Sequence, residues 1–190
     1  LGQKHPLTFL VAEDNHINRR VLLNMLRKLG YNEVYEACNG KEAVRVMQET
    51  LTTHRAAEIP SDPISGEYPI PTQWNNKKGK PLKPVDLVLM DLWMPEMDGY
   101  EATSKILQLV DENRGQQPTL PPAYRQHLDN LSATPTPTSL LPPPTILAVS
   151  ADVTDEALSR ASKVGMKGYM TKPYKLSDLE RLIVEFCVGV

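Results

Sequence analysis

Five side chains whose chemistry suits metal ions and phosphate each follow a short apolar run in this sequence. They are Glu13, Asp14, Asp91, Ser150 and Lys172. Carboxylates held close together repel one another, and a hard divalent cation relieves that repulsion. Mg²⁺ suits such a group because it keeps several waters and takes only one or two protein carboxylates directly, and Mn²⁺ accepts similar oxygen ligands. We expect Asp14 and Asp91 to be direct ligands and Glu13 to act through water.

The lysine and the serine suit the binding of an anion beside that cation. The ammonium of Lys172 is a compact point charge that can bind phosphate, and the hydroxyl of Ser150 can donate a hydrogen bond to it. A carboxylate can itself attack phosphorus and form an acyl phosphate. Positioning and charge neutralisation are most of what phosphoryl transfer requires. Asp91 is therefore the candidate nucleophile.

The longest apolar run places Asp91 at the end of a buried strand. Residues 85–91 read Val-Asp-Leu-Val-Leu-Met-Asp, which is typical of a strand covered on both faces of a parallel sheet. Pro95, Asp98 and Gly99 then supply turn residues. Ligands of open α/β sheets gather at this edge, beyond the carboxyl ends of the strands. A simpler alternative is that Asp91 only begins a turn.

Five apolar runs predict strands, and five amphipathic segments predict helices. The strands are expected at 8–12, 34–37, 85–91, 145–149 and 168–171. The helices are expected at 16–29, 40–51, 100–110, 155–164 and 177–188. This alternation predicts an α/β fold, a doubly wound parallel sheet with helices on both faces. Its strand ends share one edge, so the five functional side chains should converge there.

Composition narrows the function classes. The chain has 190 residues, 41% of them hydrophobic, and a formal charge of −2, which gives no field that would attract nucleic acid or an anionic membrane. It has no apolar run of the roughly 20 residues that span a bilayer and no signal peptide, so we expect a soluble cytoplasmic protein. Cys38 and Cys187 lack metal-ligand spacing and are expected to be buried, reduced thiols. The chain begins without methionine, and we expect it to be part of a longer protein.

Proline marks two insertions in a single domain that spans residues 1–190. Of the 17 prolines, six fall within 52–84 and eight within 111–144, and such segments are not expected in helix or strand interiors. Without them 123 residues remain, close to the commonest domain size. We therefore predict one compact domain with two long proline-rich insertions, one before the third strand and one before the fourth.

The motifs around the functional side chains resemble those of response-regulator receiver domains, the CheY-like family. Four motifs carry the resemblance: Val-Ala-Glu-Asp-Asn-His-Ile-Asn at 11–18, Val-Leu-Met-Asp-Leu-Trp-Met-Pro-Glu-Met-Asp-Gly at 88–99, Ala-Val-Ser-Ala at 148–151 and Gly-Tyr-Met-Thr-Lys-Pro at 168–173. The resemblance implies a flavodoxin-like strand order 2-1-3-4-5. The Glu-Asp-Asn opening and the long final helix are most similar to the C-terminal receiver of a fungal-type hybrid histidine kinase.

The resemblance also assigns roles to residues. It implies that Asp91 is the phosphoacceptor, that Glu13 and Asp14 form the acidic metal pocket, and that the Trp93 backbone carbonyl is a further ligand. Two switch residues, Ser150 and Tyr169, would move on phosphorylation. Lys172 would bind the phosphoryl group, and its peptide bond to Pro173 would be cis.

Receivers of this kind accept phosphate from a histidine kinase domain and pass it to a histidine-phosphotransfer protein, with slow autodephosphorylation. Family precedent places the partner on the first helix and on the loop after the fifth strand. The expected contact residues are Ile17, Val21, Leu22, Met25, Pro173 and Tyr174. Because an amphipathic helix buries one face, some of the apolar helix residues could belong to the core instead. In isolation the domain is expected to be a monomer.

Two alternatives come from other classes. A pseudo-receiver would bind partners without phosphorylation, but it would be expected to lack an acid or the lysine, and this chain lacks neither. A dehalogenase-like phosphohydrolase would carry a second aspartate two residues after the nucleophile, where this chain has Trp93. The sequence therefore favours a phosphorylated receiver.

Overall fold

A five-stranded parallel sheet forms the centre of the molecule. The computed structural model describes residues 1–57, 82–115 and 142–188. The strands are β1 (Phe9–Ala12), β2 (Val34–Ala37), β3 (Leu87–Asp91), β4 (Thr145–Ser150) and β5 (Gly168–Thr171). Their order is β2-β1-β3-β4-β5, which confirms the predicted fold class and strand order. The connections run in opposite directions from the β1–β3 pair, and ligands of doubly wound sheets bind at such a switch point.

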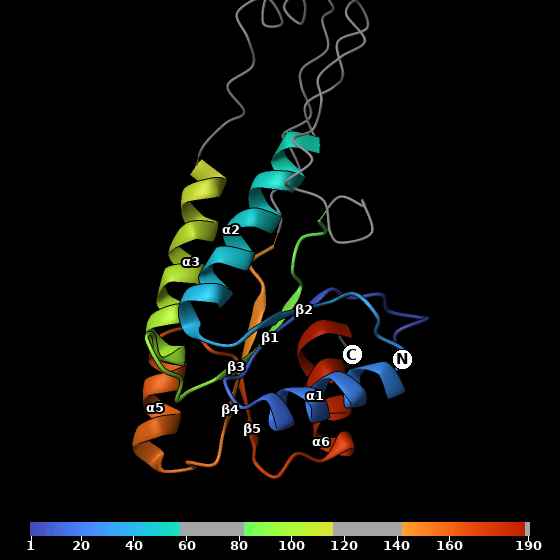
Figure 1. Cartoon of the computed structure of the whole chain (residues 1–190), viewed down its shortest axis with the longest axis vertical. Helices are drawn as coiled ribbons and strands as arrows, with labels where there is room; N and C mark the ends of the chain where they lie inside the picture. The colour runs from blue at the N-terminus through green and yellow to red at the C-terminus, as the bar shows by residue number, and fades with distance from the viewer. Residues whose placement is uncertain (58–81, 116–141, 189–190) are drawn as a thin grey trace, which may run out of the picture.

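Helices cover both faces of the sheet (Figure 1). They are α1 (His16–Lys28), α2 (Gly40–Ala57), α3 (Gly99–Gly115), α5 (Asp155–Lys163) and α6 (Leu176–Ile183), and a π-helical turn, η2 (Val184–Val188), follows the last of them. The final helix was predicted over 177–188, but its α-helical part ends at Ile183. In the part of the chain that the structure describes, no helix combines the length and hydropathy that a membrane span needs.

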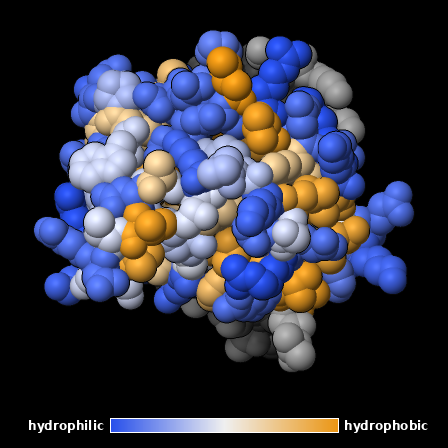
Figure 2. Space-filling view, turned by 90° about the horizontal axis from the view of Figure 1, so that it is seen from below, coloured by the Kyte–Doolittle hydropathy of each residue, from blue (hydrophilic) through white to orange (hydrophobic). Residues whose placement is uncertain are grey.

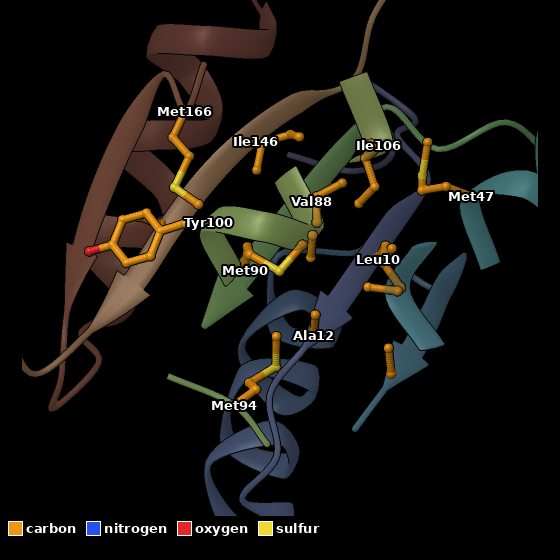
Figure 3. Close-up of a cluster of buried hydrophobic side chains, with 14 of the residues drawn as sticks. Leu10, Ala12, Met47, Val88, Met90, Met94, Tyr100, Ile106, Ile146 and Met166 are labelled. Carbon is orange, nitrogen blue, oxygen red and sulfur yellow. The ribbon is translucent and has the colours of Figure 1, made fainter. Parts of the chain in front are cut away.

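Alternate residues of the central strands point into two separate cores. Leu10 and Val88 face α2 and α3 and pack with Met47 and Ile106 (Figure 3). The residues between them on the strands face α1 and α6, in the cluster of Phe9, Val11, Leu87, Leu89, Leu22, Leu26, Leu179 and Leu182. β3 is buried along its whole length. The sheet is therefore covered on both sides, and its carboxyl edge is left for function.

Two helices run further than the sequence predicted. We expected α2 to end at residue 51 and α3 at 110, but they continue to Ala57 and Gly115. The predicted helix ends are therefore too early, and the insertions at 52–84 and 111–144 stay a prediction. The extra turns contain no proline, and the first prolines come only at Pro60 and Pro118, where a helix cannot continue easily. The remaining parts of the insertions, 58–81 and 116–141, lie outside the described residues.

Helix ends follow the local sequence more closely. The side chain of Asn15 accepts hydrogen bonds from the backbone of Ile17 and Asn18 at the start of α1, as expected of an N-cap. Gly30 and Gly165 have positive φ angles, 92° and 103°, just after α1 and α5. The expectation of a buried Cys38 is wrong, because this thiol lies exposed in the loop that leaves the edge strand β2.

Candidate functional site

The predicted functional side chains meet where β1, β3, β4 and β5 end. Glu13 directly follows β1, Asp91 and Ser150 are the last residues of β3 and β4, and Lys172 directly follows β5. The ammonium of Lys172 lies 2.7 Å from Asp91 Oδ2 and 2.9 Å from Glu13 Oε2. The Lys172–Pro173 peptide bond is cis, as the resemblance implies. The parallel register thus brings together groups that lie up to about 160 residues apart in the chain.

Three carboxylates form an acidic pocket at this edge. Glu13, Asp14 and Asp91 each offer an oxygen, and these oxygens lie within 4.8 Å of one another. Glu13 and Asp91 are 1% and 3% exposed, whereas Asp14 is open to solvent. Hard oxygen ligands beside solvent fit Mg²⁺, which retains several of its waters. Trp93, whose carbonyl is the further expected ligand, donates its backbone N–H to Asp91 Oδ1 at 3.4 Å.

Charge in the pocket is only partly compensated. Burial raises the pKa of Asp91, the Lys172 ammonium lowers it and the Glu13 charge raises it, which leaves it at about 6. Burial also raises the pKa of Glu13, but the hydrogen bonds from Lys172 and Tyr174 outweigh burial and lower it overall. The two carboxylates in turn raise the pKa of Lys172 in spite of its burial. Lys172 therefore stays charged. Of the two buried carboxylates, Asp91 is the one whose charge is less well compensated, because its pKa is raised whereas that of Glu13 is lowered.

Three partners of Glu13 were not predicted as site residues, namely Asn15, Asn18 and Arg19, and Tyr174 was predicted only as a contact residue of the partner protein. Glu13 Oε1 accepts from the backbone N–H of Asn15 and the side-chain amide of Asn18, and Glu13 Oε2 accepts from the hydroxyl of Tyr174. Arg19 donates to the Glu13 backbone carbonyl at 2.7 Å. The asparagines follow Glu13 by two and five positions, so local spacing could have indicated them. The contact with Tyr174 spans 161 positions, and the sequence carries no signal for it.

The two expected switch residues lie on neighbouring strands. Ser150 is 1% exposed, and its hydroxyl accepts the backbone N–H of Asp152 at 3.1 Å. The hydroxyl of Tyr169 is buried, and within the described residues it makes no hydrogen bond of standard geometry. Burial raises the pKa of Tyr169, and the nearby Ser150 hydroxyl lowers it in part. Their movement on phosphorylation stays a prediction.

The expected partner face is accessible except at one position. Ile17 and Val21 are 62% and 38% exposed, Pro173 is exposed, and Met25 and Tyr174 are half-buried. Leu22 is 0% exposed because it lies on the inner side of α1, in the core against the sheet. Its assignment as a contact residue is therefore wrong. Figure 2 shows hydrophobic side chains on the face seen from below, mainly over the half that α1 and α6 occupy.

Comparisons with known proteins agree with this architecture. The probable histidine kinase 4 of Oryza sativa subsp. japonica is 30% identical to the chain over 178 residues, which cover 93% of the chain and 13% of the kinase. The receiver domain of the histidine kinase CKI1 from Arabidopsis thaliana, solved with Mg²⁺, has a TM-score of 0.62 at 27% identity and covers 95% of this chain and 92% of that domain. No family model matches the chain.

A further solved structure supports the fold alone. It is the Saccharomyces cerevisiae complex of the histidine phosphotransfer protein Ypd1 with the receiver domain of the response regulator Ssk1. The TM-score is 0.63 at 23% identity, with 96% of this chain and 89% of that chain covered. The chain spans 7% to 14% of the length of three curated histidine kinases that it matches. Its sheet order and its likeness to kinase receivers along most of its length identify this chain as a receiver domain, similar to those of histidine kinases.

Proposed function

We propose that this receiver accepts a phosphoryl group on Asp91 from a phosphohistidine, in a Mg²⁺-dependent reaction, and passes it to a histidine-phosphotransfer protein. The observation that carries this proposal is the contact of Lys172 with Asp91 at 2.7 Å inside a pocket of three carboxylates. This arrangement places a nucleophile, a phosphate-binding cation and a set of oxygen ligands at one point, which is what phosphoryl transfer requires.

Five side chains share the chemistry. A carboxylate oxygen of Asp91 attacks phosphorus, the P–N bond of the phosphohistidine breaks, and the imidazole nitrogen leaves with the electron pair and takes up a proton. Asp14 and Asp91 would hold Mg²⁺, with Glu13 acting through water, and the ion would neutralise negative charge. Lys172 moves from its carboxylate partners to a phosphoryl oxygen, and Ser150 donates its hydroxyl to another. Because its pKa is about 6, Asp91 is largely ionised at neutral pH.

Relatives support the choice of partners. The chain matches histidine kinases, and the Ssk1 receiver has been crystallised with a histidine phosphotransfer protein. On this chain the surface that we assign to such a partner is Ile17 and Val21 on α1 together with Pro173 and Tyr174 after β5. We place this domain in the cytoplasm.

Phosphorylation is testable by intact mass after incubation with acetyl phosphate. We expect the wild-type chain to gain one phosphoryl group when Mg²⁺ is present and none in EDTA, and we expect a histidine-phosphotransfer protein to remove it. The Asp91→Asn variant should gain none, whereas Asp111→Asn, which changes an exposed aspartate on α3, should behave as wild type. If the wild type neither gains mass nor binds beryllofluoride, the chain is a pseudo-receiver.

Trp93 is expected to prolong the life of the phosphoryl group. Its indole lies two residues after Asp91, is 55% exposed and meets the ring of Tyr100 edge-on, with the ring centroids 6.1 Å apart. In that position we expect it to cover part of the approach to the acyl phosphate. Trp93→Ala should therefore shorten the phosphoryl half-life several-fold, measured by the decay of the phosphorylated mass. An equal or longer half-life would show that water reaches Asp91 by another route.

A further inference from the structure

We propose that Tyr174 is a positioning residue for the cation site, through the hydrogen bond from its hydroxyl to Glu13 Oε2. The two atoms lie 2.7 Å apart, which is a short distance typical of a bond to a charged acceptor. The inference rests on the proposed function, because it concerns the Mg²⁺ that the acidic pocket is proposed to bind. It assigns Tyr174 a role inside the site in addition to its expected place on the partner face.

The hydrogen bonds of Glu13 account for all of its acceptor positions. A carboxylate has about four lone-pair sites, two on each oxygen. Oε1 accepts from Asn15 and Asn18, at 3.3 Å and 3.4 Å. Oε2 accepts from Tyr174 and Lys172, at 2.7 Å and 2.9 Å. Glu13 is therefore oriented from both sides and, while these bonds persist, it can reach a cation only through water.

The two donors on Oε2 differ in how firmly they are fixed. Lys172 is shared with Asp91 and is expected to move to the phosphoryl group when Asp91 is modified. The ring of Tyr174 packs against the core cluster that contains Leu22, Leu179 and Leu182, so its hydroxyl is held in place. Burial raises the pKa of Tyr174, and Glu13 raises it further, so this donor stays neutral and protonated. Tyr174 therefore keeps Glu13 oriented after Lys172 has left.

Removal of the hydroxyl should weaken cation binding without removing a ligand. In Tyr174→Phe we expect the dissociation constant for Mg²⁺, measured by calorimetry, to rise about tenfold, as is usual when a partner of a metal-binding carboxylate is lost. The matched control is Tyr31→Phe. Tyr31 is buried, and its hydroxyl has no hydrogen-bond partner among the residues that the structure describes, so the dissociation constant should not change.

A double-mutant cycle separates this role from a general effect on the fold. In a Glu13→Ala background the acceptor is gone, so Tyr174→Phe should have no further effect on Mg²⁺ binding. A tenfold effect in that background would overturn the proposal. An NMR experiment on the wild-type protein tests the same role without a variant. In protein labelled with ¹³C at tyrosine Cζ, Mg²⁺ should shift the signal of Tyr174 and leave that of Tyr31 unchanged. An unmoved Tyr174 signal would overturn the role.

The outcomes also distinguish this role from the proposed function. If the wild-type chain binds Mg²⁺ and Tyr174→Phe binds it equally well, the positioning role is wrong and the proposed function stands. If the wild type binds no Mg²⁺, the proposed function fails and the positioning role fails with it.

Discussion

Replacing Asp91 with asparagine is expected to stabilise the metal-free domain near neutral pH by about 2 kcal/mol, although it removes an ion pair. The pKa of Asp91 is raised from 3.8 to about 6, mainly by burial and against the attraction of Lys172. The folded state therefore binds more protons than the unfolded state between these two pH values. The unfolding free energy of the wild type should fall as the pH rises from about 4 to about 6, since Asp91 loses its proton there. Asparagine keeps the size of the side chain and carries no charge.

Urea unfolding in EDTA and in Mg²⁺ tests this expectation. In EDTA, Asp91→Asn should be more stable than wild type at about pH 7.5, and its advantage should shrink towards pH 4. Mg²⁺ should stabilise the wild type and have little effect on the variant, because a ligand stabilises only the state that binds it. Asp111→Asn is the control, since that carboxylate is exposed. A variant that is less stable than wild type in EDTA would mean that the attraction of Lys172 outweighs the cost of burying the charge.

The parts of this site that the sequence predicts are those that strand topology positions. An apolar run such as 87–91 is stable only when both of its faces are buried in the protein. A parallel sheet then aligns the ends of its strands at one edge. This fixes where Glu13, Asp91 and Lys172 lie even though they are distant in sequence. Their contacts at 2.7 Å and 2.9 Å are consequences of that edge.

The features that could not be predicted depend on packing between elements. Val21 and Leu22 are adjacent and both apolar, yet one is 38% exposed and the other fully buried, because the orientation of α1 against the sheet decides which side faces inwards. Apolar periodicity alone leaves that orientation open by about one residue. The bond between Tyr174 and Glu13 joins the loop after β5 to the end of β1, although β3 and β4 lie between these two strands in the sheet. Local patterns contain no information on such a pair.

Gly99→Ala is expected to lower the free energy of unfolding by about 2 to 3 kcal/mol. Helix propensity alone would predict an increase. Gly99 is the first residue of α3, and alanine in a helix is favoured over glycine by up to about 1 kcal/mol. A Cβ atom at this position would overlap the backbone carbonyl oxygen of Asp91 and lie 3.0 Å from the Cα atom of Leu92. The Gly99 N–H also donates to the Leu92 carbonyl at 3.0 Å. The helix therefore begins directly against the end of β3.

This close approach links stability to the proposed chemistry. To admit a methyl group, either the start of α3 or the end of β3 must move, and the second movement displaces Asp91 from Lys172 and from the acidic pocket. Thermal unfolding should show the loss of stability, and the yield of phosphorylated protein from acetyl phosphate should fall in the fraction that remains folded. Ser104→Ala, on an exposed position of the same helix, is the control and should change neither quantity appreciably. If Gly99→Ala were as stable as wild type, α3 would be free to shift against β3, and the loop at 92–98 would not depend on glycine for its closure.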